Sequence, residues 1–396
     1  MQPFARDLLL GAAKVNRRQW VYFAIFVLLL ALSVHGVHFV PFWKARGLDF
    51  SNLFLFHRNC PEWPVPYGPN GARCGDPLAR DLVYPPLVYW MFAWTRFLPF
   101  NIAETLWMLA IPFLVFCGVA IVEKADRKPA TFRELSVFLL VFQLPMLYAM
   151  ERGNNDALVV PLFCAGIAYF VSGRVFVAGA LYAAACWMKV YPVIPSVVLL
   201  AALFTDPMLR RGRGRSFLKG FVAGGIVLAI LLLPDSYRYV FKVLPELSSR
   251  EGGFGTSSHT LFRGAASLLV KLPVLVLWVW TTRKVLTRDP ILVLAAGLAI
   301  STFFANLSND YNLVTAYPFL FLMIRRTFRE GMTGLDFAMC ILTFWAFVGD
   351  RTALEWIFPN RSALLLQVGW FFAFPLYLRK RYFASAEISF SSVSSI

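Results

Sequence analysis

The chain has 396 residues, of which 59% are hydrophobic and only 15% are charged, and its formal net charge is +16. About a quarter of the residues of soluble globular proteins are charged, so this composition excludes an ordinary soluble domain. Apolar runs long enough to cross a bilayer recur along the chain, and the period-2 alternation of membrane β-strands does not appear. The sequence therefore predicts an all-α, polytopic helical membrane protein in a single integral membrane domain, 1–396.

About twelve transmembrane helices are expected. The first, near 20–38, follows Arg17-Arg18 without a cleavage site, which indicates a retained helix. With both termini cytoplasmic, most of the excess positive charge falls in cytoplasmic segments, as the positive-inside rule requires. The run from Arg210 to Arg215 is the strongest of these anchors, and topology explains it better than nucleic-acid binding. The later helices are expected near 101–122, 133–149, 156–171, 174–188, 190–205, 217–233, 266–282, 290–305, 312–324, 334–349 and 362–378.

The segment 39–100 is predicted to be the first extracytoplasmic loop and to contain an active-site segment. It holds the acids Asp49 and Asp81 and the aromatic Tyr84, among many Pro and aromatic residues. Loops of this length are usually functional or disordered, and this composition argues against disorder. Residues 85–99 are apolar but short and flanked by prolines, so we expect a juxtamembrane or re-entrant helix there. Asp49 alone could equally be a helix cap or a surface acid.

Two of the six cysteines, Cys60 and Cys74, lie in this first loop. An extracytoplasmic location is oxidising, so the pair could form a disulfide worth about 3 kcal/mol. Zinc is a weaker alternative, because His57 is the only further ligand of the usual kind nearby. The other four cysteines fall within predicted helices and are expected to be buried apolar residues.

Further polar clusters fall between helices on the same predicted outer face. They comprise Arg152 with Asn154, Asn155 and Asp156; Lys189; Asp310 with Tyr311; and His259 with Arg263 in a second extracytoplasmic loop, 234–265. Each cluster has a structural alternative: Arg152 in a solvated turn, Asn154, Asn155 and Asp310 as helix caps, and Lys189 reaching the membrane interface. Polar groups near a membrane are expensive, and their common face favours a functional site there.

These residues resemble a known family. Arg152-Gly153-Asn154-Asn155-Asp156, followed by Lys189-x-x-Pro192, is similar to the Gly-x-Asn…Lys-x-x-Pro core of glycosyltransferase family 87 in the GT-C superfamily. Asp49 followed by Tyr84-Pro85-Pro86, and Asn309-Asp310-Tyr311 followed by Tyr317-Pro318, resemble further segments of that family. The family more often has Gln where Asn154 stands, and the Cys60–Cys74 insert makes the first loop more elaborate, so the resemblance does not extend to the acceptor.

The resemblance implies a GT-C-like fold and inverting transfer of one sugar from a polyprenyl-phosphate donor, mannose-like, to a lipid or glycan acceptor. It implies Asp49 as general base; for the donor phosphate we expect Lys189 and Arg152, with Arg263 or His259. Sugar or acceptor contacts are expected from Asn154, Asn155, Asp156, Tyr84, Asp81, Asp310 and Tyr311. No cofactor or metal is expected, since no Asp-x-Asp motif stands in the first loop. The expected location is a bacterial inner membrane, with membrane lipids but no nucleic acid as partners.

Two other functional classes stay open at this point. A lipid-linked sugar transporter or flippase would place charges in mid-helix and show paired broken helices, and few such charges and no clear internal repeat are present. A polysaccharide polymerase or ligase would concentrate Arg and His in one long late loop, which 234–265 matches only in part. Consumption of a polyprenyl-phosphate sugar by the purified protein would separate these classes.

Overall fold

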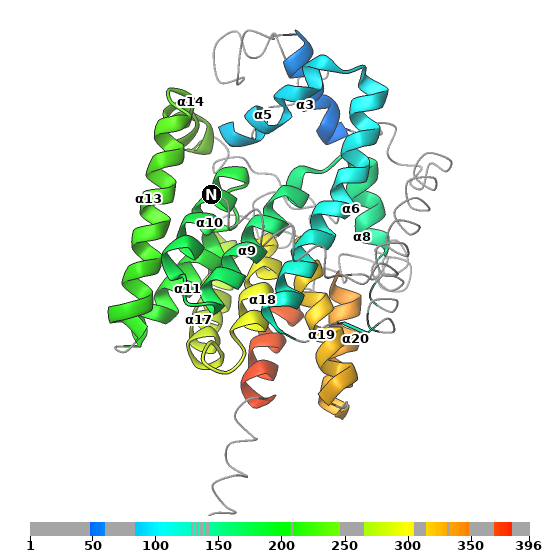
Figure 1. Ribbon diagram of the computed structural model, residues 1–396. Helices are drawn as coiled ribbons and strands as arrows, with labels where there is room; N and C mark the ends of the chain where they lie inside the picture. Colours follow the sequence, from blue (N-terminus) through cyan, green and yellow to red (C-terminus); the bar gives the residue numbers. More distant parts are fainter. Residues whose placement is uncertain are drawn as a thin grey trace, which may run out of the picture.

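The computed structural model describes residues 48–59, 84–127, 130–131, 134, 138, 143–206, 209–245, 265–304, 314–330, 333–347 and 368–381. Across these ranges the regular structure is helical and includes no β-strand, which confirms the all-α expectation for this part of the chain. The helices form a bundle in which most of the long ones run between the same two ends (Figure 1).

Four helices form the most closely packed part of the bundle, each against the next in chain order. Small residues allow these approaches: a Cβ added at Gly118 would overlap Val160, and one added at Gly220 would overlap the backbone of Phe176. Small residues at interfaces are a common means by which apolar helices approach closely in a membrane. The four helices are α6 (Phe100–Ala125), α9 (Val159–Val171), α10 (Val175–Met188) and α13 (Arg215–Leu231).

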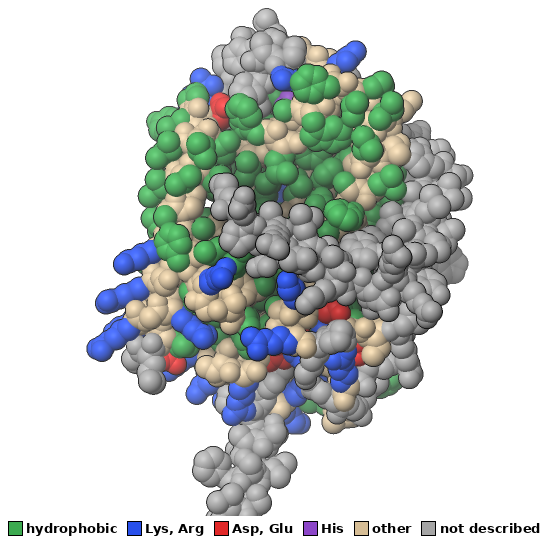
Figure 2. Space-filling model, in the orientation of Figure 1, with side chains coloured by type: hydrophobic (Ala, Val, Ile, Leu, Met, Phe, Trp, Pro, Cys, Tyr) green, Lys and Arg blue, Asp and Glu red, His purple; other side chains and the backbone are tan. Residues whose placement is uncertain are grey.

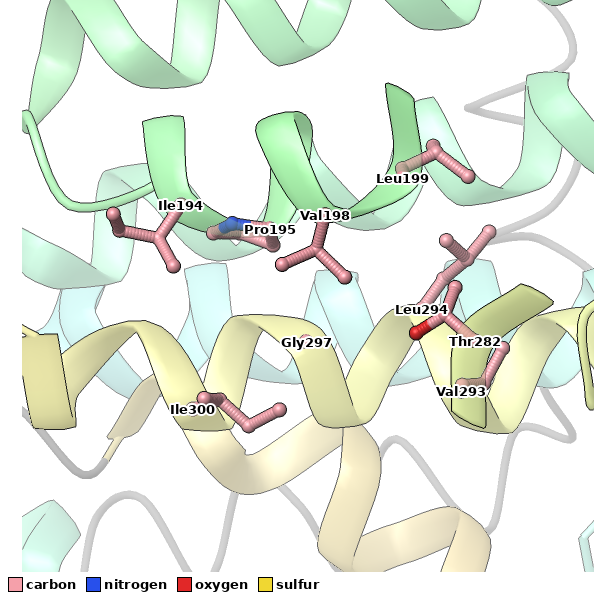
Figure 3. A pocket seen from close by; sticks show the side chains of 9 residues that line it. All are labelled: Ile194, Pro195, Val198, Leu199, Thr282, Val293, Leu294, Gly297 and Ile300. Carbon is pink, nitrogen blue, oxygen red and sulfur yellow. The ribbon is translucent and has the colours of Figure 1, made fainter. Parts of the chain in front are cut away.

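A second group comprises α11 (Val193–Thr205), α17 (Ala265–Val285) and α18 (Pro290–Phe304), which contact one another. A pocket lies between α11, α17 and α18 (Figure 3), and within it Pro195 approaches Gly297 so closely that an added Cβ would lie 3.2 Å from the proline Cβ. Its lining is aliphatic except for Thr282. Such a lining offers a sugar or a phosphate too few polar partners, so the polar chemistry of this protein has to be sought elsewhere.

A third group packs through aromatic rings and comprises α19 (Tyr317–Glu330), α20 (Gly334–Phe347) and a helix over 368–381. Trp370 stacks on Phe374 with ring centroids 4.9 Å apart, and Phe319 meets Phe374 edge-on at 4.9 Å. The indole N–H of Trp370 donates to the Thr343 hydroxyl at 2.8 Å. This bond satisfies the one polar group of an otherwise apolar cluster.

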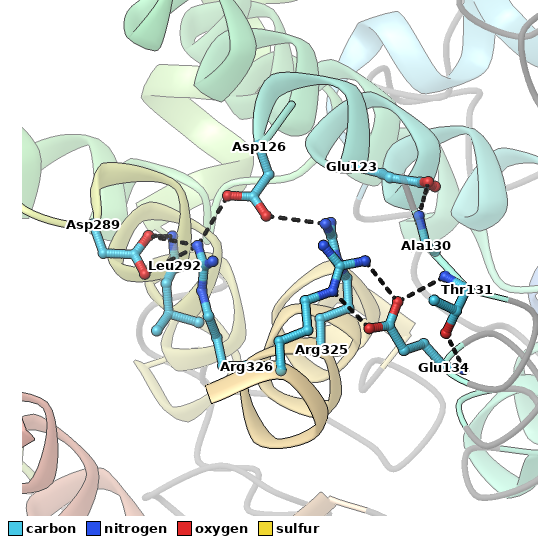
Figure 4. Close-up of polar contacts among 10 residues, drawn as sticks. Glu123, Asp126, Ala130, Thr131, Glu134, Asp289, Leu292, Arg325 and Arg326 are labelled. Carbon is cyan, nitrogen blue, oxygen red and sulfur yellow. Dashed lines mark hydrogen bonds and ion pairs between the residues drawn. The ribbon is translucent and has the colours of Figure 1, made fainter. Parts of the chain in front are cut away.

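Ion pairs join the helices at one end of the bundle (Figure 4). Asp126, just after α6, pairs with Arg325 at 3.2 Å and with Arg326 at 2.9 Å, and Arg326 also reaches Asp289 at 3.2 Å. Breaking a buried pair by removing one partner typically costs about 3–5 kcal/mol. The network therefore ties the end of α6, the start of α18 and the last turns of α19 to one another.

The two ends of the bundle differ in character. One end, here called the α3 end, is formed by α3 (Leu48–Asn59), α5 (Pro86–Phe92), the 3-10 turn η1 (Ala93–Phe97) and α14 (Asp235–Arg238) (Figure 1). Lys and Arg side chains gather at the opposite end, here called the basic end, and among the described residues hydrophobic side chains dominate the rest of the visible face (Figure 2). This asymmetry has the form that the positive-inside rule predicts.

Within the described ranges, two helices are long and apolar enough to cross a bilayer by length and composition, Phe100–Ala125 and Arg210–Leu231. Shorter apolar helices accompany them, so the number of twelve spans stays a prediction. Some expected boundaries were wrong. Helix α8 (Gln143–Arg152) continues past the expected end at residue 149, and α19 continues past residue 324 because its arginines meet acidic partners. The predicted loop 39–100 contains α3 as well as the expected short helix after residue 85.

Candidate active site

Helix α3 holds Asp49 in its first turn. An acid there, with His57 and Arg58 in the last turn, complements the helix dipole. Phe50 is fully buried and packs against the rings of Phe92 and Phe100, with centroids 6.0 Å away in each case. Asp49 is therefore attached directly to an anchored residue, on a helix rather than on a free loop.

His57, at the other end of α3, contributes a second anchor. Its Nε2–H donates to the Tyr89 carbonyl on α5 at 2.8 Å, and the ring is 4% exposed. Burial is the largest influence on this ring and lowers the pKa of His57 below its ordinary value. The neutral ring therefore joins α3 to α5. Cys60 and Cys74, which would join His57 in the zinc alternative, lie outside the described residues.

The segment after α8 is brought against α3 by a glycine. Gly153 has φ +66°, in the left-handed region that favours glycine, and this conformation ends α8. An added Cβ at Gly153 would overlap the Phe50 side chain. The indole N–H of Trp107 on α6 donates to the Gly153 carbonyl at 2.9 Å. Three helices thus fix the position of the chain between Arg152 and Asp156.

This arrangement places the first of two carboxylate–cation pairs at the α3 end. Arg152 Nη2 lies 3.4 Å from Asp49 Oδ1, although the two residues are 103 positions apart in the chain. The Arg152 and Asp49 side chains are 15% and 13% exposed, respectively. An ion pair so poorly solvated is screened by salt much less than one on an open surface.

The second pair joins Asp156 and Lys189. Lys189 follows the end of α10, and its Nζ lies 2.9 Å from Asp156 Oδ1 and 4.6 Å from the centroid of the Tyr84 ring. The Asp156 side chain is completely buried and that of Lys189 is 17% exposed. The Lys189 ammonium therefore points to a carboxylate and an aromatic face rather than reaching out to the membrane interface.

Two neighbouring carboxamides lie between these pairs. Asn154 caps the 3-10 turn η2 (Asn155–Leu158) by accepting from the Asp156 amide, so the capping alternative holds for its Oδ1. Its Nδ2, and both polar atoms of the Asn155 side chain, are buried without a hydrogen-bond partner among the described residues. Leaving such a group unpaired costs about 1–3 kcal/mol, which a hydrogen-bonding ligand would remove.

Seven of the predicted residues are not among those that the structure describes. Asp81, His259, Arg263, Asp310, Tyr311, Cys60 and Cys74 lie outside the described residues. In the parts that are described, no group of three or more His, Cys, Asp and Glu side chains is arranged to hold a metal ion. The structure brings together residues from four separate stretches of the chain, namely Asp49, Tyr84, Arg152 with Asn154, Asn155 and Asp156, and Lys189.

The sequence interpretation overlooked two residues of this site. Trp107 holds the Gly153 carbonyl from within an apolar helix, where nothing in the local sequence marks it. Tyr191 places a buried hydroxyl beside the Asp156 carboxylate. Its position two residues after Lys189, within the same Lys-x-x-Pro stretch, is the signal that could have identified it.

Chemically, the arrangement offers two cations, two carboxylates and buried amide donors that have no partner among the described residues. Cations and amide N–H groups suit a phosphate, because charge-assisted hydrogen bonds are the stronger kind. Carboxylates and carboxamides suit sugar hydroxyls. Asp49 retains some exposure while Asp156 has none, so Asp49 is the carboxylate that a reactant could reach.

Comparison with known proteins agrees with this chemistry. The model of glycosyltransferase family 87 matches residues 82–324, which is more than half of the chain. One relative is the polyprenol-phosphate-mannose-dependent alpha-(1-2)-phosphatidylinositol pentamannoside mannosyltransferase of Mycobacterium tuberculosis (strain CDC 1551 / Oshkosh), which is 23% identical over 251 residues. The match covers 62% of this chain and 56% of that relative, so the chain spans little more than half of its length. On the extent of the family match, the chain belongs to glycosyltransferase family 87.

Proposed function

We propose that this protein is a membrane glycosyltransferase that transfers one sugar from a polyprenyl-phosphate donor to a lipid or glycan acceptor, with inversion at the sugar. The observation that carries the proposal is the pairing of Asp49 with Arg152 beside the Asp156–Lys189 pair at the α3 end. Membership of a glycosyltransferase family supports the reaction class. The name of the mycobacterial relative supports a mannose-like sugar on a polyprenyl phosphate.

The roles follow from what the reaction needs. One base has to take the proton of the acceptor hydroxyl, and Asp49 is suited to this because its carboxylate is partly exposed. The departing phosphate needs cations rather than an acid, and Lys189 and Arg152 are suited to this. Asp156 is already committed to Lys189 within the protein interior, which makes it a counter-ion and a neighbour of the sugar rather than the base.

The remaining assignments extend the proposal to the predicted loops. Arg263 and His259 would assist at the phosphate, and Asp81, Asp310 and Tyr311 would join Asn154, Asn155 and Tyr84 around the sugar and the acceptor. The α3 end, with loops 39–100 and 234–265, would face the outside of a bacterial inner membrane. The basic end and both termini would lie in the cytoplasm, which agrees with the distribution of charge on the bundle.

The test uses purified protein in proteoliposomes with a polyprenyl-phosphate mannose that is radiolabelled in the sugar. Asp49→Asn should lower the rate of transfer by about 100- to 10,000-fold, the usual contribution of general base catalysis, while donor binding changes little. Substantial turnover by this variant would move the role of base to Asp81 or Asp76, the two other aspartates in the sequence of the predicted first loop. Movement of intact donor across the bilayer without loss of its sugar would favour the transporter alternative.

Lys189→Met tests the phosphate contact separately. It removes the cation but keeps most of the side-chain volume, and a lost hydrogen bond to a charged group is worth about 1.5–3 kcal/mol. The KM for the donor should therefore rise by about 10- to 100-fold, with a smaller change in kcat. Unchanged donor affinity would show that Lys189 only holds Asp156 in place.

A further inference from the structure

A second charged feature lies at the basic end, away from the candidate active site. The turn between α9 and α10, the π-helical turn η3 (Arg210–Gly214) and the first residues of α13 carry six exposed cations. Between residues 169 and 219 the only acid is Asp206. The six cations are Arg174, Arg210, Arg211, Arg213, Arg215 and Lys219.

These cations are gathered in space, not only in sequence. The guanidinium of Arg174 lies over the Tyr169 ring at 5.9 Å, and that of Arg213 lies over the neighbouring Phe170 ring at 5.7 Å. Both contacts are to the last residues of α9. Arg213 of η3 and Arg174 of the α9–α10 turn therefore both lie at the end of α9. Blue side chains project from this region in Figure 2.

The cluster differs from the other arginines at the same end of the bundle. Arg325, Arg326, Arg329 and Arg381 each pair with Asp126, Asp289, Glu134 or Asp336. None of the six clustered cations has an ion-pair partner in the described part of the chain. Their charge is therefore not neutralised by those parts of the protein and is available to an external anion.

An apolar helix surface adjoins the cations. Helix α13 packs on α10 through its glycine face, while Val222, Ile226, Val227 and Ile230 are each about half exposed or more. Leu218, next to Lys219, is also exposed. The same helix thus offers an open apolar surface that begins beside a cluster of uncompensated cations.

We propose that this cluster is a binding site for an acidic phospholipid of the adjacent membrane leaflet, with the phosphate headgroup at Arg174 and η3 and an acyl chain along α13. A phosphate and an alkyl chain in one molecule match the two adjoining surfaces. A nucleic acid would use the cations but would leave the apolar surface unmatched. The site is separate from the candidate active site, and its test needs no sugar transfer.

The expected strength follows from the number of cations. Each Lys or Arg near an acidic lipid surface contributes about 1 kcal/mol, which is about fivefold in affinity. Removing two of them should weaken binding by about 25-fold before screening by salt, so we expect about tenfold in physiological salt. The pair Arg211→Gln/Arg213→Gln is suitable because both side chains are exposed and neither touches the candidate active site.

A matched control lies at the same end of the bundle. Arg283 and Lys284 of α17 are exposed cations, and Arg283→Gln/Lys284→Gln removes the same charge outside the cluster. Purified protein of each kind would be mixed with equal amounts of phosphatidylglycerol and phosphatidylcholine in detergent. Native mass spectrometry then counts the bound lipids of each class at several ionic strengths.

The unmodified protein should retain phosphatidylglycerol in preference to phosphatidylcholine. The ratio of bound phosphatidylglycerol to bound phosphatidylcholine should fall about tenfold in the Arg211→Gln/Arg213→Gln variant. In the Arg283→Gln/Lys284→Gln variant it should fall less than about twofold. No preference in the unmodified protein, or equal losses in both variants, would overturn the proposal. Tighter binding of an RNA oligonucleotide than of phosphatidylglycerol, abolished in the first variant, would assign the cluster to nucleic acid instead.

Discussion

Gly153→Ala should displace Asp49 without altering any charged residue. Gly153 has φ +66°, and its position against Phe50 leaves no space for a Cβ. Alanine in the left-handed region costs about 1–2 kcal/mol, and the overlap adds about 1–3 kcal/mol of overpacking. Because Phe50 directly follows Asp49, relief of the overlap has to move the start of α3 away from Arg152.

Gly173→Ala separates the two contributions. Gly173 has φ +85°, so an alanine there has a similar backbone cost, but no atom lies within 4 Å of the added Cβ. Thermal unfolding followed by circular dichroism should show the larger destabilisation for Gly153→Ala, by about the cost of the overlap. A displacement of about 1 Å near reacting groups can lower a rate by about 100-fold.

Transfer from the polyprenyl-phosphate sugar should accordingly fall about 100-fold in Gly153→Ala and stay within a few-fold of normal in Gly173→Ala. Equal losses of stability and activity in the two variants would refute the reasoning. The effect of Gly153 would then come from its backbone conformation alone, and the contact with Phe50 would not set the position of Asp49.

Three further outcomes are expected. Burial lowers the pKa of His57 from its ordinary 6.5, so folding favours the neutral ring, and the contribution of His57 to the free energy of unfolding should be complete above pH 6.5 and be lost as the pH drops through the folded pKa. A His57→Gln variant should lose this pH dependence, and an unchanged dependence of the free energy of unfolding on pH would contradict the prediction. Trp107→Phe removes the bond to the Gly153 carbonyl and should cost about 1 kcal/mol in thermal unfolding, whereas no change would remove Trp107 from the support of the site. Alkylation and mass spectrometry of unreduced protein should find Cys60 and Cys74 joined in a disulfide that shapes the acceptor side, and two free thiols would refute the pairing.

Local patterns in the sequence predicted several of the described helices. Long apolar runs have to satisfy their backbone groups internally in a membrane, so the runs near 101–122 and 174–188 predicted α6 and α10 closely. Charge placement likewise predicted a bundle with one basic end. Helix α3 was missed because residues 48–59 were interpreted as loop, although Asp49 and Arg58 at its two ends carry the appropriate charges.

The sequence alone also singled out Asp49, Arg152, Asp156 and Lys189 as polar residues at helix ends on one face. It could not determine which of them pair, because each carboxylate could have met either cation. The tertiary structure decided this through contacts between distant segments. Gly153 allows α8 to end against α3, so that Arg152 pairs with Asp49. The close packing of α10 on α9 places Lys189 next to Asp156. Such pairings depend on the path of the whole chain, and no local pattern contains that information.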